Sequence, residues 1–331
     1  MAIASAAVTR HRRPARLGAL TLAAATVAAA CGGGSDDADE AERLPTTSTS
    51  AVPTTAPPTT APSTTTTAPV DVDALRPPPA PSDPGALAAQ ITEAEAVLRR
   101  TDASPSEVAT AALAQQVGYR QLGDHPEWDA AVFAALPAEL HPAAERHVAA
   151  RRDLRALTGE PSDTMPAWRI VPPEPAADLV TWYQEAEATF GVPWQYLAAI
   201  NLVETGMGRI RGTSVAGAQG PMQFMPATWE AYGEGDVNDP RQAILGAGRY
   251  LAANGAPGDM ASALWNYNHS DRYVRAVQAY AELIVEHPGA YAGFHGWGVW
   301  YWSTAGDIYL PVGWEAMEQV PVDQYVAANP Q

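Results

Sequence analysis

The sequence predicts a mainly α-helical protein. Between residues 83 and 290, apolar residues recur every three or four positions in several stretches, which is the period of one helix face. Several of these stretches begin with residues that cap or start helices, and glycine ends some of them. Alternating, strand-like patterns are sparse until the aromatic C-terminal segment. We therefore expect a helical body with an N-terminal helical unit and a short β or irregular C-terminal segment.

Residues 1–30 have the pattern of a signal peptide. A basic stretch at 10–16 precedes an apolar run at 17–30, which is too short to span a bilayer. Cys31 is the single cysteine of the chain and follows a run of alanines, so the site resembles a bacterial lipobox, although Ala28 stands where leucine is usual. An ordinary cleavage site with an incidental cysteine is the alternative. We favour lipidation of Cys31, which would anchor an exported protein to the outer face of the cytoplasmic membrane.

Residues 31–82 read as a linker. The stretch "TTSTSAVPTTAPPTTAPSTTTTAPV" at 46–70 contains almost no side chain that could build a core. Its threonine, proline and serine bias is typical of an extended, disordered tether. A lipid anchor followed by such a tether predicts a domain that works at some distance from the membrane.

The charge balance narrows the choice of partners. A formal net charge of -17 argues against nucleic acid, whose phosphates attract Lys and Arg. It does not argue against a neutral sugar polymer, and the ten Trp fit sugar stacking as well as ordinary core packing. One cysteine excludes an intrachain disulfide.

Residues 83–165 are expected to form the N-terminal helical unit. Asp83 is a candidate N-cap, with Pro84 at the first helical position. Ser104 and Glu107 have the spacing of a capping box. Two further helical patterns cover 128–136 and 142–157, and no function is visible in this unit.

Residues 166–290 are expected to form a second helical domain. A helix that carries Leu179 and Phe190 ends at Gly191, and Pro193 can start the next helix. That helix ends near Glu204, where "ETGMG" interrupts it. The later helices are predicted at 226–232, 240–253, 260–265 and 271–285.

Glu204 is the one acidic residue between positions 199 and 229, in a chain with 37 Asp and Glu. The negative end of the helix dipole and partial burial would both raise its pKa. A carboxyl group with a raised pKa can donate a proton near neutral pH. A surface glutamate at a frayed helix end is the alternative.

Two motifs downstream of Glu204 favour the chemical interpretation. "SVAGAQGPMQFMP" combines close-packing glycines with Ser214 and Gln223, and "LWNYNHSDRYV" contains Tyr267 and Asn268. Their side chains can hydrogen-bond sugar hydroxyls or acetamides without adding charge. Ordinary hydrogen bonding within loops and the core is the alternative for each.

In this order the motifs resemble those of lytic transglycosylases of the lysozyme-like superfamily, closest to the membrane-bound B-type group and its actinobacterial relatives. The resemblance covers about 168–310 and rests on "NLVETGMGR", "SVAGAQGPMQFMPATWEAYG", "NDPRQAILGAGRYLAANG" and "ALWNYNHSDRYVRAVQAYA". It implies a lysozyme-like catalytic domain with Glu204 as the catalytic acid. It also places Ser214, Gln223, Tyr267 and Asn268 in the substrate site. Thr205, where many relatives have serine, keeps the hydroxyl and is a further substrate-binding candidate.

The resemblance implies cleavage of the MurNAc–GlcNAc β-1,4 bond of peptidoglycan with formation of 1,6-anhydro-MurNAc. One carboxyl group would act first as acid and then as base, whereas most glycosidases use two. A hydrolytic muramidase and a non-catalytic cell-wall-binding lipoprotein are the alternatives. We expect no cofactor and no metal, because "GEGDVNDP" lacks the spacing of a calcium loop. Protein partners are not indicated.

Residues 291–331 form the aromatic C-terminal segment. "FHGWGVWYWSTAGDIYLPVGW" is rich in residues that favour strands and large apolar surfaces. Extra sugar subsites are one interpretation. We favour a segment that wraps and seals the helical core.

Overall fold

A computed structural model describes residues 74–329. The predicted signal peptide and Cys31 lie outside these residues, as does most of the predicted linker. The described part contains twelve α-helices, two short 3-10 helices and six short strands. The prediction of a mainly helical protein is confirmed.

The first four helices build a unit with its own small core. They are α1 (Pro84–Leu98), α2 (Pro105–Asp124), α3 (Asp129–Ala135) and α4 (His141–Thr158), with 3-10 turns at Pro126–Trp128 and Ala138–Leu140. Asp83 caps α1 by accepting hydrogen bonds from the amides of Gly85 and Ala86. The capping box of Ser104 and Glu107 forms at α2 as predicted. Leu87, Ile91 and Leu122 are fully buried in the core of this unit.

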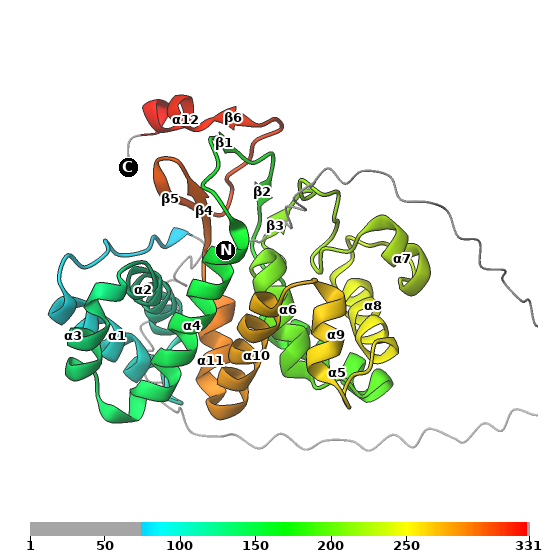
Figure 1. Cartoon of the computed structure of the whole chain (residues 1–331), viewed down its shortest axis with the longest axis horizontal. Coiled ribbons are helices and arrows are strands. Elements are labelled where there is room, and N and C mark those ends of the chain that lie inside the picture. Colours follow the sequence, from blue (N-terminus) through cyan, green and yellow to red (C-terminus); the bar gives the residue numbers. More distant parts are fainter. Residues whose placement is uncertain (1–73, 330–331) are drawn as a thin grey trace, which may run out of the picture. The chain divides into compact units, whose positions relative to one another are not determined.

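The second set of helices surrounds α6. These helices are α5 (Ala176–Phe190), α6 (Trp194–Thr205), α7 (Pro226–Tyr232), α8 (Pro240–Ala253), α9 (Met260–Tyr267), α10 (Asp271–Glu286) and α11 (Pro288–Gly296). Gly191 ends α5 in the left-handed conformation that the sequence predicted. Figure 1 shows α10 beside both α4 and α6, and it packs against both. Their largest core cluster joins residues of α4 to those of α5–α11.

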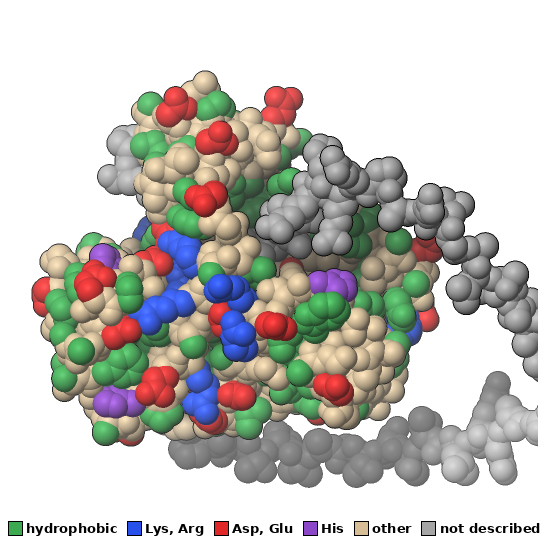
Figure 2. All heavy atoms as spheres, viewed as in Figure 1, with side chains coloured by type: hydrophobic (Ala, Val, Ile, Leu, Met, Phe, Trp, Pro, Cys, Tyr) green, Lys and Arg blue, Asp and Glu red, His purple; other side chains and the backbone are tan. Residues whose placement is uncertain are grey.

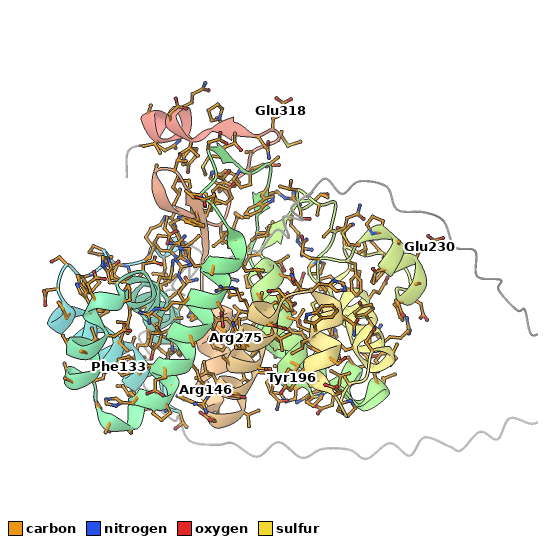
Figure 3. All side chains as sticks on the ribbon, viewed as in Figure 1. Phe133, Arg146, Tyr196, Glu230, Arg275 and Glu318 are labelled. Carbon is orange, nitrogen blue, oxygen red and sulfur yellow. The ribbon has the colours of Figure 1, made fainter. Side chains whose placement is uncertain are left out.

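Ion pairs cross between α4 and α10 on the surface. Arg275 of α10 donates to Asp153 of α4 over 2.9 and 2.7 Å. Arg146 of α4 donates to Glu282 of α10 over 3.0 Å. Figure 2 shows Arg side chains gathered over these two helices among Asp and Glu, and Figure 3 labels Arg146 and Arg275 there.

The short strands form three antiparallel pairs. β1 (Thr164–Met165) pairs with β6 (Val320–Pro321), and β2 (Arg169–Ile170) pairs with β3 (Ile210–Arg211). β4 (Val299–Ser303) and β5 (Gly306–Leu310) form a hairpin. Buried apolar residues of β1–β5 share one cluster with Trp168 and Val322. The segment directly after α6 is thus joined through β3 to the C-terminal part of the chain.

The C-terminal segment is more helical than predicted. Residues 291–296 continue α11, and α12 (Val322–Ala328) follows β6. Pro288 starts α11, and the His287 side chain accepts a hydrogen bond from the amide of Gly289 as an unusual cap. The predicted short strands, β4, β5 and β6, lie between these two helices. Phe294, Trp297, Val299 and Leu310 are buried, which favours the wrapping interpretation.

Candidate active site

Helix α6 brings Glu204 to the boundary of the core. Its residues 197–205 are all buried, so the helix has no solvent-facing side over its second half. Gly206 then takes the left-handed conformation (φ 61°) and ends the helix, with its amide bonded to the carbonyls of Asn201 and Leu202. Glu204 therefore lies in the last turn of a buried helix, as the sequence predicted.

The carboxyl group of Glu204 is almost removed from water. The residue is 6% exposed. Oε1 accepts a hydrogen bond of 2.8 Å from the hydroxyl of Tyr273, which is itself fully buried on α10. Burial raises the pKa of Glu204 to about 8, and the Tyr273 hydrogen bond acts in the opposite direction. The carboxyl group is thus mainly protonated at neutral pH.

No second carboxylate influences Glu204 within residues 74–329. Burial raises the pKa of Glu204, the Tyr273 hydrogen bond lowers it, and no carboxylate of this part of the chain contributes to the shift. Two carboxylates downstream of the Gln223 loop, Asp236 and Asp239, have other partners. Asp236 accepts a hydrogen bond of 2.9 Å from the amide of Asn238, and Asp239 caps α8 at the amide of Gln242.

Tyr267 lies beside Tyr273 but has a different hydrogen-bond partner. The two rings are parallel within 4°, with centroids 6.4 Å apart. The Tyr267 hydroxyl donates to the carbonyl oxygen of Met222 over 2.7 Å. Burial, followed by the charge of Glu204, raises the pKa of both phenols well above its usual value. Both hydroxyls therefore stay protonated and remain donors.

Thr205 is fully buried and offers no surface to a ligand. Its hydroxyl donates to the carbonyl oxygen of Pro221 over 2.6 Å and accepts from the amide of Gly208 over 3.1 Å. It also lies 3.3 Å from Oδ1 of Asn201, whose amide nitrogen donates to the Tyr183 hydroxyl. These contacts join the end of α6 to the loop that contains Pro221.

Gln223 lies in that loop with a left-handed backbone (φ 50°), which is uncommon for a residue with a side chain. Its Nε2 donates to the carbonyl oxygen of Gly220 over 2.9 Å, which leaves Oε1 as an acceptor. Gly220 is also left-handed (φ 72°), and a methyl group there would overlap the carbonyl oxygen of Val237. Glycine at 220 is therefore required both by the backbone and by the close approach.

Ser214 and Asn268 complete the set of predicted residues. The hydroxyl of Ser214 accepts from the amide of Ala218 over 2.9 Å, and these two buried residues close a short turn. Asn268 follows α9, and its backbone bonds to Leu264 and Ser270. Its side-chain amide has no hydrogen-bond partner among residues 74–329.

Thr205 and Tyr267 thus both donate hydrogen bonds to the loop that precedes Gln223, and Tyr267 lies beside Tyr273, the partner of Glu204. The hydrogen bonds of Ser214 and Asn268 described above stay within their own turns. Sequence reasoning missed Tyr273, the direct partner of Glu204. An aromatic residue on the apolar face of the predicted helix at 271–285 was the available signal.

Within the described residues, no three His, Cys, Asp or Glu side chains are grouped so that they could hold a metal ion. No helix in the same part of the chain has both the length and the apolar character needed to cross a membrane.

The helical domain thus places a buried glutamic acid with a raised pKa at the end of α6. Residues 181–282 match the family model described as the transglycosylase SLT domain, and this stretch contains α6, the Gln223 loop, α9 and most of α10.

One curated relative is the membrane-bound lytic murein transglycosylase F of Thiobacillus denitrificans, which is 38% identical over 80 residues. The match covers 24% of this chain and 17% of the relative, so it spans less than a fifth of that protein. No solved structure matches the chain.

Proposed function

We propose that the protein is a peptidoglycan lytic transglycosylase, which cleaves the MurNAc–GlcNAc β-1,4 bond and forms 1,6-anhydro-MurNAc. The observation that carries this proposal is the state of Glu204. It is a buried carboxyl group inside the stretch that matches the transglycosylase SLT domain, and burial raises its pKa to about 8 with no contribution from a second carboxylate of residues 74–329.

In the first half of the reaction Glu204 acts as the general acid. The Tyr273 hydroxyl donates to Oε1, so the acidic proton belongs on Oε2, which accepts no hydrogen bond from residues 74–329. Oε2–H donates its proton to the glycosidic oxygen as the bond to C1 breaks. The resulting positive charge on the sugar is stabilised by the ionised Glu204 and by the acetamido group of the muramoyl residue.

In the second half Glu204 acts as the base. The carboxylate takes the proton of the C6 hydroxyl of the same sugar, and the C6 oxygen bonds to C1. The carboxyl group returns to its protonated form and no water is consumed. Between the two halves, the Tyr273 hydrogen bond stabilises the carboxylate, which is otherwise opposed by burial.

Asn268 and Gln223 are proposed to contact the glycan strand. Asn268 has an amide with no partner in the described part of the chain, and Gln223 keeps Oε1 as an acceptor for a sugar hydroxyl or acetamide N–H. The Ser214 hydroxyl still has its own proton to donate. For Thr205 we propose a positioning role in place of the expected substrate contact, because its side chain is fully buried.

The test is mass spectrometry of the sugars that the full chain releases from purified peptidoglycan. A lytic transglycosylase yields muramoyl ends one water lighter than those of a hydrolase. Glu204→Gln should release neither product. Glu230, an exposed acid on α7 (Figure 3), gives the matched control Glu230→Gln, which should retain activity. Reducing ends in place of anhydro ends would replace this proposal with a muramidase.

We also propose attachment to the cell envelope through a lipid on Cys31, as in the sequence interpretation. The relative from Thiobacillus denitrificans is described as membrane-bound, which supports an envelope location. Labelling of cells with a radioactive fatty acid should mark the full chain and not its Cys31→Ser variant. Equal labelling of both proteins would remove the lipid from this position.

A further inference from the structure

Two hydroxyl groups bind consecutive carbonyl oxygens of the loop before Gln223. The Thr205 hydroxyl donates to Pro221 over 2.6 Å, and the Tyr267 hydroxyl donates to Met222 over 2.7 Å. The donors come from different helices, α6 and α9, and meet adjacent peptide units. We call this pair of hydrogen bonds the loop clamp.

The backbone that follows the loop clamp has an unfavourable conformation. Gln223 has a φ of 50°, although its side chain disfavours the left-handed region. Its amide bonds to the carbonyl of Gly220 over 3.0 Å, and Gln219 and Phe224 exchange two backbone hydrogen bonds of 2.9 and 2.8 Å. Such a tight turn persists when surrounding contacts hold it.

The Thr205 side of the loop clamp is itself supported from the core. Asn201 lies one turn before Thr205, and its Oδ1 lies 3.3 Å from the Thr205 hydroxyl. The amide nitrogen of Asn201 donates to the Tyr183 hydroxyl over 2.8 Å. All three side chains are buried, so the hydroxyl of Thr205 has little freedom to choose another acceptor.

We propose that Thr205 and Tyr267 are positioning residues that act through the carbonyls of Pro221 and Met222 to hold Gln223 toward the glycan strand. The inference rests on the proposed function and deepens it. Gln223 uses one of its two Nε2 protons on Gly220, so it can offer the substrate the acceptor Oε1 and the second Nε2 proton. The substrate group that it takes is therefore a hydroxyl or an acetamide, which can both donate and accept.

Thr205→Val and Tyr267→Phe each remove one hydroxyl and keep the shape of the side chain. We expect each to raise KM for soluble glycan strands about five- to tenfold, which is the worth of one hydrogen bond, with a smaller change in kcat. Thr205→Ser keeps the hydroxyl and should restore KM. If Thr205 acted through packing alone, Thr205→Val would leave KM unchanged and Thr205→Ser would raise it, because valine is closer to threonine in shape than serine is.

A double-mutant cycle with Gln223→Ala tests the route of action. If the loop clamp acts through Gln223, Thr205→Val in the Gln223→Ala background should cause no further rise in KM. Rises that multiply independently would overturn the proposal. Tyr267→Phe provides a second, independent cycle with the same two outcomes if Thr205→Val yields little folded protein.

Hydrogen exchange separates this inference from the proposed function. Loss of either hydroxyl should speed exchange of the Gln219 and Phe224 amides, and amides in α8 should be unchanged as an internal control. This measurement needs no activity. If the full chain releases no anhydro sugar, the proposed function fails while the loop clamp is still tested. Unchanged exchange in both variants would overturn the loop clamp.

Discussion

The hydroxyl oxygen of Tyr273 lies 2.8 Å from Oε1 of Glu204, across 69 positions of sequence. Both side chains are buried. Burial favours the protonated form of Glu204, and the hydrogen bond from Tyr273 stabilises the carboxylate when the proton is lost. A group that is to serve as acid and then as base in one turnover needs both properties.

Tyr273→Phe should move the pH dependence of kcat/KM. Activity requires protonated Glu204 in the free enzyme, so it should fall as pH rises through about 8. Removal of the Tyr273 hydrogen bond raises the pKa of Glu204 further, and this limb should shift to higher pH. Tyr280→Phe, a buried tyrosine of the same helix, is the control and should leave the limb in place. An unmoved limb in Tyr273→Phe would separate this hydroxyl from the chemistry.

Glu204→Gln should stabilise the fold at high pH. The folded pKa of about 8 exceeds the unfolded value of 4.5, so the stabilisation from proton binding is complete below pH 4.5 and is lost as pH rises through 8. The glutamine of the Glu204→Gln variant does not titrate, so its stability does not change with pH at this position. The gain in unfolding free energy should be small at pH 5 and reach at most about 5 kcal/mol near pH 9. Denaturant unfolding at both pH values measures the gain in unfolding free energy. An equal gain at pH 5 and pH 9 would contradict a raised pKa of Glu204 in the folded protein.

His147 should weaken the N-terminal helices in acid. It is 2% exposed and stacked on Tyr119, and burial lowers its pKa from 6.5 to about 4, against the attraction of Glu95. The unfolded chain binds the proton more tightly, so stability should fall as pH drops from 6.5 to 4, by up to about 3 kcal/mol. Denaturant midpoints of the protein and of His147→Phe should converge over this range. His141→Phe, a less buried histidine of α4, is the comparison and should not alter the slope.

Asp307→Asn should destabilise the protein by about 3–5 kcal/mol, the usual cost of breaking a buried ion pair. Asp307 is the second residue of β5 and receives hydrogen bonds from Arg120, Arg151 and Arg155 of α2 and α4. The variant leaves two buried guanidinium groups short of negative charge. Thermal unfolding beside the exposed control Asp323→Asn measures the loss. A difference within experimental error would show that the hairpin does not depend on this contact.

Gly220→Ala should be more harmful than Gly217→Ala. Both positions have a positive φ, which costs about 1 kcal/mol for alanine. At Gly217 the new methyl group would meet no atom within 4 Å, whereas at Gly220 it would overlap the carbonyl oxygen of Val237. We expect Gly220→Ala to lower both the melting temperature and activity, and Gly217→Ala to lower only the former, slightly. Equal effects would exclude the close approach as the cause.

The sequence predicted what local patterns determine. The caps at Asp83 and Ser104, the left-handed end of α5 at Gly191 and the placement of Glu204 near a helix end all depend on residues close to each other in the chain. The burial of Glu204 was also predicted, because its helix is apolar along its second half.

The rest depends on contacts between distant segments. Tyr273 reads as an ordinary apolar-face residue until α10 packs on α6. Thr205 was expected to contact the substrate, because the sequence does not reveal that its hydroxyl donates to the carbonyl oxygen of Pro221. Helices α11 and α12 were missed because aromatic and β-branched residues favour strands locally, whereas burial against other elements decided their conformation.

Helix α10 makes contacts on two of its faces. One of its faces carries Tyr273 to Glu204, and another is covered by α4, where Arg275 meets Asp153. The N-terminal helices thus support the chemistry without approaching it, since they hold the backbone from which Tyr273 extends. A chain shortened to begin after α4 would keep every proposed catalytic group and lose the surface that keeps one of them in place.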